Sequence, residues 1–315
     1  RLIDVSRILK FQTLGEVTMQ LIAWISMVYL GLTFGLSFSI VKIILMEIDS
    51  PIVILFWQSC FSSFLLFASC FFSLNSLRDV INNLGVMVLL ACFGVIIPNF
   101  ILYLSATHLS AGTISILLAL IPFCAYIIAL ILRIEQIDLL RLFGVVLGFI
   151  AIAFLVFPGQ TSNKTYVNFW IIVGLLVPIF ISAVNISLAS ESFKRLKPLH
   201  IAFGMNLLSA MFLSLMLPSN VNFWFSLNSS KLFFLLFLLS FIGSIGFIIF
   251  IKLVKNYGPV FASQVNYLVT LFGIMWGYII FSEVHSIRFW VSLLLLIFGL
   301  FLVRPIKNNK HTFTD

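Results

Sequence analysis

The chain has 315 residues, of which 62% are hydrophobic and only 9% are charged, and its mean hydropathy is +1.21. Soluble domains carry roughly 25% charged residues, so this composition excludes a water-soluble globular protein and makes a bilayer the solvent. The net charge of +8 does not indicate a nucleic-acid-binding protein, because the basic residues gather in the connections on one side of the membrane.

Ten apolar segments follow one another along the chain, and a membrane-spanning helix needs about 20 such residues. They lie at Leu21–Val41, Ile52–Phe72, Leu84–Leu104, Thr113–Leu132, Leu142–Phe157, Phe169–Ser190, Leu199–Leu217, Leu232–Ile251, Pro259–Phe281 and Phe289–Val303. The fifth and the tenth are short, but they occupy equivalent places in the two halves. We therefore expect an all-α membrane protein with ten transmembrane helices.

The second five segments repeat the pattern of the first five. Pro122–Glu135 aligns with Thr270–Glu283 at a constant offset (270 − 122 = 283 − 135 = 148). Because five is odd, the second copy enters the membrane from the opposite side, and two inverted copies are typical of transporters that open to either face in turn. The predicted division is an N-terminal segment at 1–19, repeats at 20–157 and 169–304, a Pro/Gly/Ser/Thr/Asn linker at 158–168 and a tail at 305–315.

The basic residues predict the orientation of the chain. With the N-terminus inside, 14 of the 18 Lys and Arg residues lie in cytoplasmic segments, and only Lys42, Lys164, Lys231 and Arg288 lie outside. An excess of Lys and Arg marks the cytoplasmic side, so both termini are expected in the cytoplasm.

Residues that could carry chemistry are scarce inside the spans. The ten acidic residues and four histidines all lie at span edges, and Cys60, Cys70, Cys92 and Cys124 show no metal-ligand spacing. This argues against a buried proton relay and against an intramembrane enzyme, which needs an acid, base or metal beside its substrate. We expect no metal and no cofactor.

Neutral polar residues form stripes in three spans. The ninth carries Ser263, Asn266, Tyr267 and Thr270 at i, i+3, i+4 and i+7, the sixth carries Ser182 and Asn185, and the third carries Asn99 and Tyr103. An amide in hydrocarbon is costly, so such stripes do not face lipid. Either they form hydrogen bonds between helices, or they line a central substrate cavity. The three stripes together favour a cavity, and Tyr126 of the fourth span is included among the candidate substrate-binding residues.

Three prolines lie within spans. Pro98, Pro122 and Pro178 each remove a backbone hydrogen bond and so expose a carbonyl group. Broken helices near the midplane are where many transporters bind substrate, and a packing kink is the alternative interpretation.

Lys42 is the most informative charge, because it ends the first span close to Glu47 and Asp49. It either reaches the headgroups or pairs with Glu47, or it attracts a substrate carboxylate or phosphate. Trp57 enters the next span from the same side, where it either stacks on substrate or belongs to an aromatic belt.

Two glutamates occupy equivalent positions in the repeats. Glu135 and Glu283 each follow a long span and precede a short one. Either residue could cap the N-terminus of a neighbouring helix, where negative charge is favoured, or take part in gating.

These residues resemble the drug/metabolite transporter superfamily, of the EamA-domain type with ten spans. The family's first-span motif is matched by Phe34, Gly35, Phe38 and Lys42, with Phe in place of its Trp. Its Leu-Gly-Glu motif corresponds to Arg133, Ile134 and Glu135, which are followed by Gly144 and Gly148. The second copy of that motif is Phe281, Ser282 and Glu283, followed by Gly299. Pro122 is the family's mid-span proline, which Thr270 replaces in the second copy. An Arg common in the second span is Gln58 here, so an anion clamp at that position is in doubt.

The resemblance implies two inverted five-helix repeats around a central cavity, lined by spans 3, 4, 8 and 9 with help from 1 and 6, while 5 and 10 lie peripherally. It also implies small, varied substrates, such as amino acids, nucleotide-like compounds, S-adenosylmethionine-like compounds or drugs. We expect a secondary transporter of a small polar metabolite or drug in a bacterial inner membrane, and not an enzyme. The expected partners are a small-molecule substrate and the lipid bilayer, with a homodimer left open and no nucleic acid. The alternatives are a non-transporting membrane interaction or assembly protein, or an intramembrane lipid-modifying enzyme.

Overall fold

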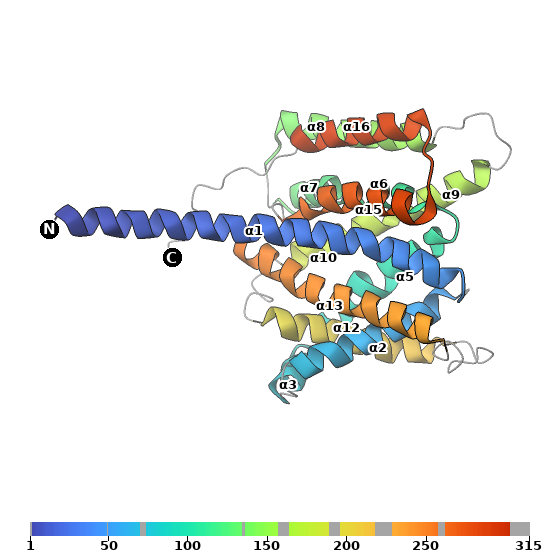
Figure 1. The fold of residues 1–315 in the computed structure, drawn as a ribbon, viewed down its shortest axis with the longest axis horizontal. Helices are drawn as coiled ribbons and strands as arrows, with labels where there is room; N and C mark the ends of the chain where they lie inside the picture. The colour runs from blue at the N-terminus through green and yellow to red at the C-terminus, as the bar shows by residue number, and fades with distance from the viewer. Residues whose placement is uncertain are drawn as a thin grey trace.

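The computed structural model describes residues 2–48, 50–69, 74–133, 136–156, 164–188, 196–217, 229–257 and 262–302. Within these ranges every regular element is a helix and none is a strand (Figure 1). In chain order they are α1 (Leu2–Leu45), α2 (Pro51–Ser69), α3 (Leu74–Asn82), α4 (Leu84–Leu90), the π-helix η1 (Ala91–Ile96), α5 (Ile97–Ala106), α6 (Ala111–Leu118), α7 (Ile121–Ile131), α8 (Leu139–Val156), α9 (Lys164–Gly174), α10 (Leu176–Leu188), α12 (Pro198–Leu215), α13 (Ser230–Tyr257), α15 (Val265–Phe281) and α16 (Ile287–Leu302).

The described helices combine into ten apolar spans, as predicted. Seven are long enough to cross a bilayer: Leu21–Leu45, Pro51–Ser69, Leu84–Ala106, Ala111–Ile131, Phe169–Leu188, Pro198–Leu215 and Ser230–Tyr257. The shorter ones are the fifth, ninth and tenth spans, at Leu139–Ala151, Val265–Phe281 and Ile287–Gly299. The third span is built from α4, η1 and α5, the fourth from α6 and α7, and the sixth from α9 and α10.

Each span of the first copy makes the same kind of contacts as the span five places later in the second copy. The first span, α1, packs on α15 and α13, and the equivalent sixth span, α10, packs on α7 and α5. The second span packs on the seventh (α2 on α12), and the fifth packs on the tenth (α8 on α16). Each of these two pairs joins equivalent spans of the two copies. In Figure 1, α8 and α16 lie side by side at one edge of the bundle. This reciprocal pattern makes the two copies equivalent, and because each copy crosses the membrane five times, the second is inverted relative to the first.

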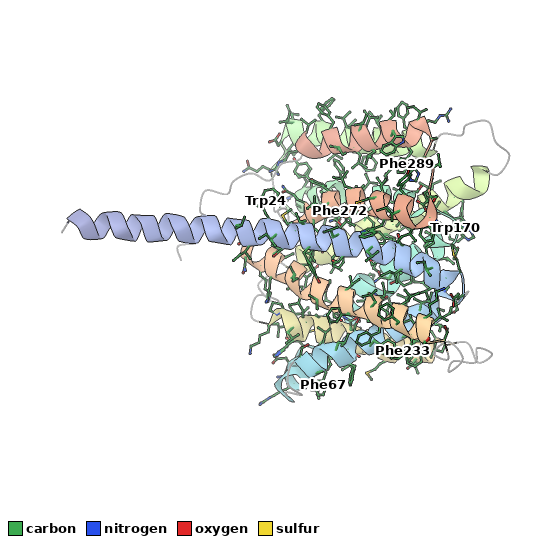
Figure 2. All side chains as sticks on the ribbon, in the orientation of Figure 1. Trp24, Phe67, Trp170, Phe233, Phe272 and Phe289 are labelled. Atoms are coloured by element: carbon green, nitrogen blue, oxygen red, sulfur yellow. The ribbon has the colours of Figure 1, made fainter. Side chains whose placement is uncertain are left out.

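The two ends of the bundle are distinct. We call the end at which α1 enters from the N-terminus the N-terminal face, and the end near Leu45 the far face (Figure 1). Figure 2 shows Trp24 and Phe67 towards the N-terminal face, and Trp170, Phe233 and Phe289 towards the far face.

Small residues bring three helices of different copies close together. A Cβ atom added to Gly35 of α1 would lie 2.8 Å from the backbone nitrogen of Gly273 in α15, and one added to Gly273 would lie 2.0 Å from Ser115 Oγ in α6. Since hydrophobic burial does not drive helices together in lipid, close backbone approach of this kind is what packs them. The crossing fixes α1, α6 and α15 relative to one another, and all three carry residues of the candidate site.

Candidate functional site

A cavity of about 220 Å³ lies in the middle of the bundle. Its wall comes from α1, α2, η1, α5, α6 and α7 of the first copy and from α10, α12, α13 and α15 of the second. The peripheral helices α8 and α16 contribute none of the described lining residues. Compared with the wall implied by the resemblance, α2 and α12 are additional contributors.

The polar part of the wall is neutral. Six side chains with amide or phenol groups line the cavity: Gln58, Asn99, Tyr103, Asn185, Asn206 and Asn266. None of the described lining residues is charged. Tyr103 donates a hydrogen bond from its hydroxyl to Gln58 Oε1, which ties α5 to α2 at the cavity wall.

Four of these six residues, Asn99, Tyr103, Asn185 and Asn266, are among the predicted substrate-binding residues, and the structure brings them together around one space. Asn206 was not among the predicted residues, although Ser209 follows it at i+3, the same spacing that separates Ser182 and Asn185 in the sixth span. The signal was present, since an amide in the middle of a span is costly unless it faces a cavity or a partner.

Other predicted residues lie outside the lining and hold helices together instead. Thr270 donates from Oγ1 to the backbone oxygens of Ser115 (2.9 Å) and Asn266 (2.7 Å), and so joins α15 to α6. Tyr126 accepts a hydrogen bond from the backbone nitrogen of Asp138 (3.0 Å) at the connection between α7 and α8. For these two residues, the structure therefore shows hydrogen bonds to neighbouring segments rather than a place in the cavity wall.

The remaining predicted residues of the stripes and the second span are also away from the cavity wall. Ser263 is buried, and Tyr267 packs against the apolar core. Trp57 stacks on Phe61, with ring centroids 5.6 Å apart. None of the three is among the lining residues.

Each of the three prolines follows an interruption in its span. Pro98 lies in the first turn of α5 after η1, Pro122 in the first turn of α7, and Pro178 is the third residue of α10. Ile121, the first residue of α7, lines the cavity, and Ser182 Oγ of α10 donates to its backbone carbonyl at 2.8 Å. Short π-helical segments such as η1 are frequent at functional sites, and Gly94 and Val95 of η1 line the cavity.

A charged cluster, formed by Lys42, Glu283 and His285, lies at the far face. The chain leaves α15 through Ser282 in the left-handed conformation (φ 52°), and the backbone nitrogens of Ser282 and Glu283 donate to Tyr278 and Gly277. This αL-type cap turns the Glu283 side chain back towards the bundle. A Cβ atom on Gly277 would lie 2.7 Å from Glu283 Oε2, so a side chain at this position would displace the carboxylate.

Glu283 binds groups of the other copy. Its Oε1 accepts hydrogen bonds from Lys42 Nζ (2.7 Å) and the backbone nitrogen of Ala111 (2.9 Å), and its Oε2 accepts from the backbone nitrogen of Gly112 (3.2 Å). Glu283 therefore caps the N-terminus of α6, where a negative charge is favoured. Lys42 pairs with Glu283, whereas Glu47 pairs with Lys231 at 2.6 Å. Glu135 lies outside the described residues.

The surroundings lower the pKa values of both Glu283 and His285, which lie in the connection between α15 and α16. Burial alone would raise the pKa of Glu283, but the hydrogen bonds from Lys42, Ala111 and Gly112 outweigh it and hold the pKa below its ordinary value. The side chain of His285 is 8% exposed and stacks on Phe289 with ring centroids 3.8 Å apart, and its Nε2 lies 3.8 Å from Glu283 Oε2. Its pKa is lowered, because burial and the nearby Lys42 charge together outweigh the attraction of Glu283.

The comparisons with known proteins agree with this architecture. A search of the curated proteins found no match. A solved structure described only as "Crystal structure of protein" has a similar fold, with a TM-score of 0.60 at 14% sequence identity over 88% of this chain and 96% of that chain. The model of the EamA-like transporter family matches twice, over residues 21–157 and 168–304. Because these two matches cover most of the sequence, the chain belongs to the EamA-like transporter family.

Proposed function

We propose that the chain is a secondary transporter that carries a small polar metabolite across a bacterial inner membrane by alternating access. The observation that carries this proposal is the cavity at the contact between the two inverted copies, with neutral amides from both copies in its wall. A site at the repeat interface stays in place while one copy moves against the other, which is how transporters of inverted repeats expose a site to each side in turn.

The size of the cavity supports a metabolite rather than a drug. Pockets for drug-sized ligands are roughly 300–1,000 Å³. The cavity measures about 220 Å³, so it suits a smaller molecule. Apolar rings such as Phe38 and Phe247 fill much of the wall, and the amides would fix the orientation of the solute.

The charged cluster is the proposed closure of the far face. Glu283 belongs to the second copy, and its partners Lys42, Ala111 and Gly112 belong to the first. Separation of the two copies at this face requires these three hydrogen bonds to break. The distribution of basic residues makes the N-terminal face cytoplasmic in this proposal, so the cluster would close the outer side.

Energy coupling follows from where the charges lie. The described lining contains no carboxylate, so exchange or facilitated transport is at least as well supported as proton coupling. If protons drive transport, Glu283 is the proposed carrier. Acid-driven uptake that persists unchanged in Glu283→Gln would exclude that role.

Cysteine accessibility tests the proposal. In a variant without native cysteines, a cysteine at Asn266, which lines the cavity, should react with a small membrane-impermeant thiol reagent added from either side of the membrane. Thr270, one turn further along α15, is only 2% exposed and is the matched control, which should stay unreactive. Equal labelling at both positions, or labelling of Asn266 from neither side, would contradict a cavity that opens to both faces.

A further inference from the structure

We infer that one seam closes the cavity on the side of the N-terminal face, and that a contact between Asp79 and His200 holds this seam shut. The seam is the contact of α12, from the second copy, with α3, α4 and η1 of the first. This inference rests on the proposed transport function, because it identifies the residues that separate when the cavity opens towards the N-terminal face.

Both sides of the seam run from the N-terminal face to the cavity. Figure 1 places α3 and the yellow start of α12 towards that face. The first described residues of α12 that line the cavity are Met205 and Asn206, and the first of the third span is Gly94. The residues that precede them in α12, α4 and η1 therefore lie between the cavity and the N-terminal face.

The seam is closely packed along its length. A Cβ atom added to Gly204 of α12 would lie 2.8 Å from Val80 Cγ2 in α3 and 2.9 Å from Met87 Sδ in α4. Val80 and Met87 are both buried. At the end beside the cavity, a Cβ atom added to Gly94 of η1 would lie 3.3 Å from Met205 Cε. Side chains packed this closely leave no room for a solute, so the two copies have to part here before one can pass.

A polar contact between the copies lies at the outer end of the seam. His200 Nδ1, in the first turn of α12, is 2.5 Å from Asp79 Oδ2 in α3, and the two side chains are 9% and 37% exposed. Water can replace such a contact at the membrane edge, so it holds the seam without making the closure permanent. Other charged contacts of this face stay within one copy, since Lys255 Nζ donates to the Leu196 carbonyl and Asp138 caps α8.

The third span has a place to bend where the seam ends. The π-helix η1 interrupts the span there, and Pro98 has no N–H group to donate to the Gly94 carbonyl. Helices bend at π-bulges and at prolines. Bending at η1 separates α4 from α12, while Asn99 and Tyr103 of α5 keep their places in the cavity wall.

A disulfide across the seam tests the inference. Val80→Cys/Gly204→Cys is combined with the reporter Asn266→Cys in the variant without native cysteines, since the seam pair lies within disulfide reach. After oxidation with copper phenanthroline, labelling of the reporter by 2-(trimethylammonium)ethyl methanethiosulfonate from the N-terminal side should fall at least about tenfold, because the seam can no longer open. Treatment with dithiothreitol before labelling should restore the rate, and labelling from the far side should not change. Unchanged labelling from the N-terminal side, loss of labelling from both sides, or a pair that does not oxidise would overturn the inference.

The contact between Asp79 and His200 is tested separately with the same reporter. Asp79→Ala should speed labelling from the N-terminal side about three- to tenfold, because His200 loses its acceptor and the seam opens more often. Asp138→Ala is the matched control, since Asp138 lies at the same face but accepts its hydrogen bond from the backbone nitrogen of Leu140 in its own copy. An unchanged rate in Asp79→Ala, or an equal gain in both variants, would show that the contact does not hold the seam.

The reporter alone separates this inference from the proposed function. If Asn266→Cys reacts from both sides but the disulfide does not block the N-terminal side, alternating access stands and the seam is wrong. If the reporter reacts from the N-terminal side only and the disulfide blocks it, the seam is a real closure and the transport proposal fails. A reporter that never reacts from the N-terminal side contradicts both.

Discussion

The cavity and the charged cluster meet on α1, where Val41 lines the cavity and the next residue, Lys42, belongs to the cluster. The two regions nevertheless differ in chemistry. The cavity wall combines neutral amides with phenyl rings, whereas the cluster contains an ion pair and a buried imidazole. An ion in the middle of the membrane is far more expensive than one at its edge. The division therefore keeps full charges at the edge of the bundle, where Lys42 and Glu283 neutralise each other, and leaves the described cavity wall free of them.

The hydrogen bonds of the two regions also differ in whether they join the two copies. All three hydrogen bonds of Glu283 cross from one copy to the other, so separation of the copies at this face would break them. The cavity amides of α5, α12 and α15 are instead anchored to their own helices. They keep their orientation whether or not the copies separate. In the proposed mechanism, recognition would be carried by helices that move as rigid bodies, and closure by the contacts between them.

The largest expected effect lies in the cavity. Asn266→Leu should slow transport in proteoliposomes at least about tenfold, because one oriented acceptor is lost. The thermal unfolding midpoint in detergent should remain unchanged or rise, since a leucine in an apolar bundle leaves no polar group unpaired. Normal transport in this variant would mean that Asn266 only packs the helices. The cavity would then have no special role compared with the charged cluster.

The second effect concerns the cluster. Lys42→Met should lower the stability of the folded protein by about 2 kcal/mol, because Glu283, whose side chain is 9% exposed, keeps its backbone donors but loses its cation. The double variant Lys42→Met/Glu283→Gln should recover part of the loss, since no unpaired charge remains. Thermal unfolding in detergent measures both.

The ion pair between Lys231 and Glu47 is the matched control. Lys231 is 64% exposed, so Lys231→Met should change stability by less than about 1 kcal/mol. Equal losses for Lys42→Met and Lys231→Met would show that the cluster is an ordinary surface ion pair rather than a buried contact between the copies.

Much of the fold was predictable from the sequence, because apolar length and the internal repeat depend only on the order of residues. The number of spans and their helical character follow directly from these patterns. Asn99, Asn185 and Asn266 could be found as well, because an amide within a span must face either a cavity or a partner.

The remaining parts of the site depend on the packing of distant segments. Nothing in the sequence distinguishes Asn266, which lines the cavity, from Thr270, one turn later, which binds the Ser115 carbonyl. The partner of Lys42 was equally hidden. Glu47 is five residues away in the chain, but the rigid crossing of α1 and α15 brings Glu283 to Lys42 instead.

The third prediction concerns pH. The folded state holds His285 neutral, with its pKa below the ordinary value near 6.5, while the unfolded chain takes up a proton near that value. Folding stability should therefore fall as the pH drops from about 6.5 towards the lowered pKa. Well above pH 6.5, this group should not change the stability. His285→Gln should flatten the dependence of the unfolding midpoint on pH between 7.5 and 5.5, and an unchanged slope would contradict the lowered pKa.

The smallest expected effect concerns the turn that delivers Glu283 to its partners. Ser282 adopts the left-handed conformation at φ 52°, which costs a residue with a Cβ atom about 1 kcal/mol relative to glycine. Ser282→Gly removes this strain but adds freedom to the unfolded chain, so the net gain should stay below about 1 kcal/mol. Because Glu283 keeps its position, transport should not change. A large loss of stability would instead mean that the Ser282 side chain itself holds the turn, and that the cluster depends on more than the cap and its three hydrogen bonds.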